Sequence, residues 1–156
     1  MNRVDRPALK GSLLGTLLRI WNPAMKAILR SPIHWPLSRW FAVISWTGRK
    51  SGRRYSTPVS YVLADGTVWV TTGDRWWRNV GGRMELQLRG RAREATPTVI
   101  TDPAESQREH QRLFREHRWF RWLSGIPGDG KGGADPAALE RAIGAGRVLV
   151  RIDLVP

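Results

Sequence analysis

Residues 47–58 read Thr-Gly-Arg-Lys-Ser-Gly-Arg-Arg-Tyr-Ser-Thr-Pro, a basic stretch with two glycines that lies between two strand-like runs. The runs cover residues 41–46 and 59–63 and are rich in the β-branched and aromatic side chains that strands favour. Gly48 and Gly52 allow close backbone approach, and the amide N–H groups and the cations at 49, 50, 53 and 54 suit an anion. From the residues alone two interpretations stay open, an anion-binding turn and a solvated hairpin tip.

Further strands follow this stretch. Residues 67–72 form a β-branched and aromatic run, and Asp65-Gly66 before it is typical of a two-residue hairpin turn. Residues 84–88 alternate apolar and polar side chains, Gly90-Arg91 can turn the chain into a strand that ends at Ile100, and residues 148–155 form a final strand. About six mostly antiparallel strands make a sheet small enough to close into a barrel.

Helices are predicted around these strands. Residues 8–21 carry leucines and Trp21 on one face, and Asn22-Pro23 begins a second short helix. One turn is expected at 75–80, and Asp102-Pro103 and Asp135-Pro136 each provide an N-cap followed by proline. The fold class is therefore α+β, with an N-terminal helical segment (1–36) and a barrel (37–156) in a single domain.

Composition restricts the chemistry. A formal net charge of +13 favours an anionic partner, and nine tryptophans provide flat apolar surfaces for stacking or for a membrane interface. The chain has no cysteine, and His34, His110 and His117 are too scattered to suggest a zinc site, so no metal is predicted.

The chain resembles the deazaflavin-dependent nitroreductases, a family that includes quinone reductases of actinobacteria. The resemblance covers residues 40–100 well, and its motifs are Thr47 to Gly52, Thr57-Pro58, Asp65-Gly66 and the Trp-Trp-Arg-Asn segment at 76–79. It implies a split β-barrel that binds coenzyme F420, an anionic phosphorylated deazaflavin, with FMN as the alternative cofactor.

The resemblance also implies which residues hold the cofactor. The basic turn is expected to contact the phosphate and acidic tail, and the segment after the third strand is expected near the ring. The implied cofactor residues are Arg49, Lys50, Ser51, Gly52, Arg53, Arg54, Thr57, Pro58, Thr72, Gly73, Trp77 and Asn79. Asn79 has a second interpretation, because an amide side chain can also cap a turn.

The implied chemistry is hydride transfer from the reduced deazaflavin to a quinone, nitro compound or enone, and no catalytic residue is assigned. The substrate pocket is expected to include Trp21, Trp76, Trp119 and Trp122. Late in the chain, where relatives place tyrosines, residues 119–122 hold tryptophans and a phenylalanine, which core packing also explains. Two other functions stay open: a non-catalytic binder of lipid, F420 or FMN on the same fold, and a nucleic-acid-binding module suggested by the charge.

The N-terminal segment suggests a location. Its leucine face, Trp21 and four nearby cations suit an anionic membrane surface, and packing across the barrel explains them equally well. The expectation is a cytoplasmic protein that reaches the inner face of the membrane to meet a lipophilic acceptor. The resemblance is also compatible with a homodimer.

Overall fold

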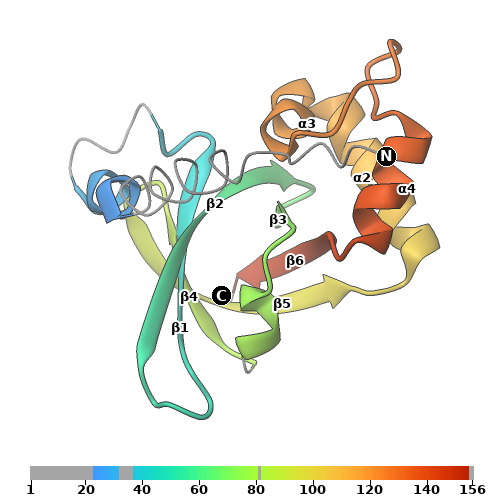
Figure 1. Ribbon diagram of the computed structural model, residues 1–156. Helices are drawn as coiled ribbons and strands as arrows, with labels where there is room; N and C mark the ends of the chain where they lie inside the picture. The colour runs from blue at the N-terminus through green and yellow to red at the C-terminus, as the bar shows by residue number, and fades with distance from the viewer. Residues whose placement is uncertain (1–22, 32–36, 81, 155–156) are drawn as a thin grey trace, which may run out of the picture.

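Six antiparallel strands close into a barrel in the computed structural model, which describes residues 23–31, 37–80 and 82–154 (Figure 1). Around the ring the order is β1-β2-β3-β6-β5-β4, and β4 pairs back with β1. This confirms the predicted α+β barrel. The strands are β1 (Phe41–Thr47), β2 (Arg54–Ala64), β3 (Thr67–Thr72), β4 (Met84–Leu88), β5 (Arg91–Ile100) and β6 (Val148–Leu154).

Two short turns set the register of neighbouring strands. Asp65 and Gly66 have φ values of 52° and 73°, the positive values that a primed hairpin turn requires, so the predicted turn between β2 and β3 is confirmed. Between β4 and β5 the turn residues are Arg89 and Gly90, with φ values of 49° and 77°. The predicted Gly90-Arg91 turn was one residue late, because Arg91 already pairs with Leu88.

The inside of the barrel is an apolar core built from alternate residues of every strand. Ile44 and Leu86 face each other across β1 and β4, and both are fully buried. The 3-10 helix η1 (Trp76–Asn79) lies at the turn predicted for 75–80, and its Trp76 joins this core. The other buried members are Ala42, Trp46, Val59, Tyr61, Val68, Val70, Met84, Ala95, Val150 and Ile152.

Three helices cover one outer side of the barrel, and Figure 1 shows them gathered together. They are α2 (Pro103–Glu116), α3 (Arg118–Ser124) and α4 (Pro136–Gly144). Asp102 and Asp135 accept backbone N–H bonds at the starts of α2 and α4, as predicted from the Asp-Pro pairs. Helix α2 ends at Glu116, and residues 119–122 lie on α3, a separate helix that was not predicted from the sequence.

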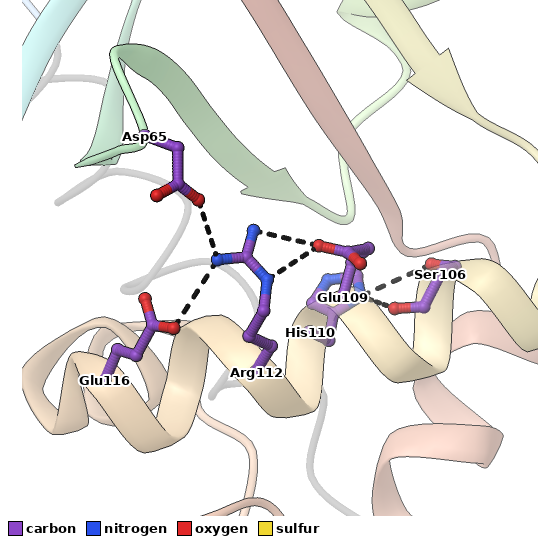
Figure 2. A network of polar contacts seen from close by, with 6 residues as sticks. All are labelled: Asp65, Ser106, Glu109, His110, Arg112 and Glu116. Carbon is purple, nitrogen blue, oxygen red and sulfur yellow. Dashed lines mark hydrogen bonds and ion pairs between the residues drawn. The ribbon is translucent and has the colours of Figure 1, made fainter.

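An ion-pair network holds the β2–β3 hairpin against α2. Figure 2 shows Arg112 of α2 between Asp65, Glu109 and Glu116, at N–O distances of 3.3, 2.9 and 3.5 Å. Its guanidinium also lies over the Trp69 ring of β3, 5.7 Å from the centroid. The network fixes α2 along the strands that it covers.

Residues 23–30 form a helix on another face of the barrel, as predicted from the sequence. Met25 and Leu29 are buried against Val43 on the outer face of β1. The predicted helix at 8–21, and Trp21 with it, lie outside the described residues. Within the described part of the chain, no helix combines the length and apolar character needed to cross a membrane.

The barrel is split along β2. Residues 54–60 of this strand pair with β1, whereas residues 61–64 pair with β3. The pairing of β2 with β3 stops at Tyr61 and Val70, and β3 continues to Thr72 beside β6. The two strands therefore separate from Ser60 and Thr71 onward, and this opening is one part of the candidate site.

Candidate functional site

The β1–β2 hairpin and η1 enclose a cleft of about 660 Å³, here called the basic cleft. Its lining consists of Gly48, Arg49, Lys50, Ser51, Tyr55 and Asn79. The structure therefore brings four of the predicted cofactor residues together: Arg49, Lys50, Ser51 and Asn79. A volume of this size lies within the range of small-molecule and cofactor sites.

Glycine is required at two points of the hairpin. Gly48 N–H donates to the Arg53 carbonyl at 2.8 Å, and Gly52 N–H donates to the Gly48 carbonyl at 2.9 Å. A Cβ on Gly48 would lie 2.7 Å from Tyr55 Cε2 and 2.8 Å from Ser51 Oγ, which is too close. Gly52 has φ of 65°, where a side chain is strained.

The cations of the hairpin are not equivalent. Arg54 pairs with Glu85 at 2.7 Å and lines a different cavity, with Ser45, Thr47 and Arg83 among its neighbours, so the structure does not place this predicted residue in the basic cleft. Arg49 donates to the Arg78 carbonyl at 3.2 Å, which attaches the hairpin to η1. Among the described residues, no carboxylate pairs with Arg49, Lys50 or Arg53, and these charges stay available to an anion.

A row of aromatic rings leads from the basic cleft into the barrel. Tyr55 stacks on Trp46 with centroids 5.9 Å apart and planes at 23°, and Trp46 lies 6.0 Å from Trp76. Trp46 and Tyr55 are direct cross-strand partners, so the pairing register itself creates the first contact. Tyr55 was not predicted as a site residue; its position at the start of β2, beside the basic turn, was the available signal.

The split between β2 and β3 holds a second hollow of about 200 Å³, here called the split cavity. Predicted site residues Pro58, Thr72, Gly73 and Trp76 line it. Its other lining residues are Val59, Ser60, Thr71, Asp74, Leu123, Ser124 and Arg147. Trp76 thus connects the two hollows, because it lines the second and contacts the aromatic row from the first.

Other predicted residues lie elsewhere. Trp77 packs against the barrel core, and the Arg78 guanidinium covers its ring at 5.1 Å. Thr57 lies on β2 opposite Ile44 and lines neither hollow. Trp119 lines a separate cavity with Trp40 and Arg89, and Trp122 is 74% exposed. The predicted substrate residues Trp76, Trp119 and Trp122 therefore do not form one pocket. The alternative explanation, core packing, holds for Phe120, which is fully buried, but not for the exposed Trp122.

A buried polar chain reaches the split cavity from α2. His110 is fully buried, and its Nε2 lies 2.8 Å from Thr71 Oγ1 while its Nδ1 lies 2.8 Å from the Ser106 carbonyl oxygen (the Ser106–His110 contact is drawn in Figure 2). Arg147 donates to Thr71 Oγ1 at 3.2 Å and to the Ser124 carbonyl at 3.1 Å. Burial lowers the pKa of His110 to about 4, so the imidazole is neutral at physiological pH.

Thr71, His110 and Arg147 were not predicted as site residues from the sequence. For His110 a signal existed, because Ser106, His110, Leu113 and Phe114 follow the spacing of one buried helix face. Burial also lowers the pKa of Arg147, an effect that the nearby Asp74 opposes. Arg147 gave no sequence signal beyond its place directly before a buried strand.

Comparisons with known proteins show the fold. No protein-family model and no curated protein match the sequence. Among solved structures, the chain is similar to HutZ, the heme storage protein of Vibrio cholerae, with 12% identity, a TM-score of 0.52, and coverage of 86% of this chain and 89% of HutZ. A second similar structure is an FMN-binding protein from Nostoc punctiforme that is related to pyridoxamine 5'-phosphate oxidase, with 16% identity, a TM-score of 0.49, and coverage of 86% of this chain and 81% of that protein. A third is a protein named F420 reductase, with 12% identity, a TM-score of 0.43, and coverage of 84% of this chain and 93% of that protein.

Proposed function

We propose that this protein binds coenzyme F420 in the basic cleft and that it is a reductase that uses the reduced cofactor. The observation that supports this most is the group of three cations, Arg49, Lys50 and Arg53, that have no acidic partner among the described residues and lie on a glycine-dependent hairpin. Of these three cations, Arg49 and Lys50 line the cleft of about 660 Å³, which has an aromatic row at its edge, whereas Arg53 lies on the same hairpin outside the lining.

The donor set fits a cofactor with an anionic end and a flat ring. Arg49, Lys50, Ser51 and Arg53 would hold the phosphate and acidic tail through charge-assisted hydrogen bonds. Asn79, Tyr55 and the side chains of the aromatic row are the groups available to a ring system. The indole nitrogens of Trp46 and Trp77 are buried and have no hydrogen-bond partner among the described residues, but neither ring lines the cleft, so they add no donor to this set.

Reduced F420 supplies a hydride to an electron-poor acceptor. The protein's own contribution is binding, orientation and exclusion of water, which hydride transfer mainly requires. Thr72 and Gly73 line the split cavity, which at about 200 Å³ is below the usual size of a cofactor site and suits a small acceptor. A quinone, a nitro compound or an enone is the proposed acceptor class.

Titration with F420, followed by tryptophan fluorescence, tests the proposal. Saturable quenching at micromolar cofactor is expected, because Trp46 and Trp76 lie along the row that begins in the cleft. Lys50→Ala should weaken binding by about threefold to tenfold, the range for one charge-assisted contact at a partly exposed site. Absence of saturable quenching in the wild-type protein would refute cofactor binding.

Arg54→Ala is the matched control, because it removes a cation from the same hairpin that is paired with Glu85 outside the cleft. Equal losses for Lys50→Ala and Arg54→Ala would show that net charge, and not the cleft, attracts the cofactor. A bound cofactor with an FMN spectrum would replace F420 in the proposal. Binding without hydride transfer to menadione would favour the non-catalytic binder.

A further inference from the structure

Arg147 places a half-buried guanidinium at the split cavity. It follows α4 and directly precedes β6. No carboxylate of the described residues forms an ion pair with it, although Asp74 is close enough to influence its pKa. Partial burial of an unpaired guanidinium is unfavourable, so a partner for this charge would stabilise the site.

The hydrogen bonds around Arg147 have only one consistent direction. A guanidinium can only donate, so Thr71 Oγ1 accepts from Arg147. The Ser106 carbonyl oxygen can only accept from Nδ1 of the neutral His110 ring, so Nε2 accepts, and the Thr71 hydroxyl donates to it. His110 then carries its ring proton on Nδ1, which donates to the Ser106 carbonyl oxygen. Thr71 therefore holds Arg147 in place through an oxygen that neutral His110 keeps oriented.

These contacts use only part of the guanidinium. Arg147 makes one bond through Nη1 to Thr71 and one through Nη2 to the Ser124 carbonyl oxygen. A guanidinium carries five N–H donors in a planar fork, so three stay free for a ligand. Gly73 lies beside this guanidinium, because a Cβ at its position would be in van der Waals contact with Arg147 Nη2 at 3.8 Å.

We propose that the split cavity binds a small carboxylate-bearing molecule through Arg147. A carboxylate matches the guanidinium fork with two parallel hydrogen bonds. The lining of the cavity is mainly polar, which suits such a group, and Trp76 and Leu123 are its largest apolar members. The volume of about 200 Å³ restricts the ligand to a single small ring or a short chain. That this molecule is the hydride acceptor rests on the function proposed above; its binding does not.

Benzoate and its neutral analogue benzamide are the probes, and the protein is used without cofactor. The indole N–H signal of Trp76 in ¹H–¹⁵N NMR spectra, assigned by its loss in Trp76→Phe, reports binding in the cavity. Benzoate should bind about tenfold more tightly than benzamide, the factor expected when the acceptor of the guanidinium's hydrogen bonds is charged instead of neutral. Equal affinity of the two probes, or no shift of the Trp76 signal, would overturn the proposal.

Variants separate the cavity from the general positive charge. Arg147→Ala should abolish the preference for benzoate, whereas Arg141→Ala, which removes an exposed cation of α4, should keep it. A preference that survives Arg147→Ala would place the anion elsewhere and would refute the assignment. The F420 titration depends on Lys50 in the basic cleft, so failure of either proposal leaves the other standing.

Thr71 serves as the test of positioning. Thr71→Val removes the hydroxyl that accepts from Arg147, while Thr71→Ser keeps it. The valine variant should lose most of the benzoate preference and the serine variant should retain it. If Thr71→Val binds benzoate as the wild-type protein does, Thr71 has no part in holding Arg147.

Discussion

The buried His110 should make the stability of this protein depend on pH. Its pKa is lowered from 6.5 to about 4 in the folded protein, chiefly by burial, with the Arg147 charge adding to the effect. The neutral imidazole is therefore favoured by folding. The contribution of neutral His110 to the free energy of unfolding is therefore complete above pH 6.5. It decreases as the pH falls below that value and is lost below about pH 4.

The magnitude follows from the same two values. The difference between 6.5 and about 4 corresponds to about 3 kcal/mol when both states are fully protonated. Most of this loss occurs before the folded protein itself titrates, so about 2 kcal/mol should disappear between about pH 8 and about pH 5.

His110→Gln provides the reference, because glutamine stays neutral and can offer an oxygen to the Thr71 hydroxyl. Urea unfolding of both proteins between about pH 8 and about pH 5 isolates His110, since the other titrating groups are shared. The free energy of unfolding of the wild-type protein should fall by about 2 kcal/mol more than that of the variant. A difference between the two proteins that is independent of pH would refute the reasoning, as would an NMR titration of His110 near pH 6.5.

Three further predictions concern single contacts. Gly48→Ala should lower the melting temperature and weaken F420 binding, because its Cβ would lie 2.7 Å from Tyr55, whereas Gly144→Ala, with open space around it, should be neutral or stabilising; equal effects in thermal unfolding would contradict the required glycine. Arg112→Ala should cost about 1 kcal/mol in urea unfolding through the lost network with Asp65 and Glu109, and a cost that is unchanged in high salt would argue against ion pairs as its cause. Asp102→Ala should cost about 1 kcal/mol through the lost cap on the Glu105 N–H, Asp102→Asn should recover most of it, and equal stability of the alanine variant would exclude the cap.

Much of the local structure could be predicted because its signals lie close together in the chain. Asp65-Gly66 is typical of the primed turns whose twist matches that of two paired strands. In an Asp-Pro pair, the aspartate side chain caps the helix by accepting from backbone N–H groups of the residues that follow it. The boundary between α2 and α3 was missed because no glycine or proline marks it; His117 ends α2 and the chain continues into α3 at once.

The candidate site likewise contains features that could be predicted from the sequence and features that could not. The clustering of Arg49, Lys50 and Ser51 was accessible from the sequence, because a tight hairpin keeps neighbouring residues together. The exclusion of Arg54 was not, because it depends on Glu85 of β4, a strand that becomes a neighbour only when the barrel closes. The same holds for Trp122, whose exposure is set by how α3 lies on the other helices.

The sequence by itself determined the strands, the Asp65-Gly66 turn, the helix caps and a basic, glycine-containing hairpin. Each of these follows from interactions within a few residues. Only the tertiary structure decided that β2 changes partner at Ser60 and Tyr61, which opens the split cavity. It also decided that Thr71, His110 and Arg147 meet there, because β3, α2 and the start of β6 are distant in the chain and are brought together by burial of the barrel's outer apolar face.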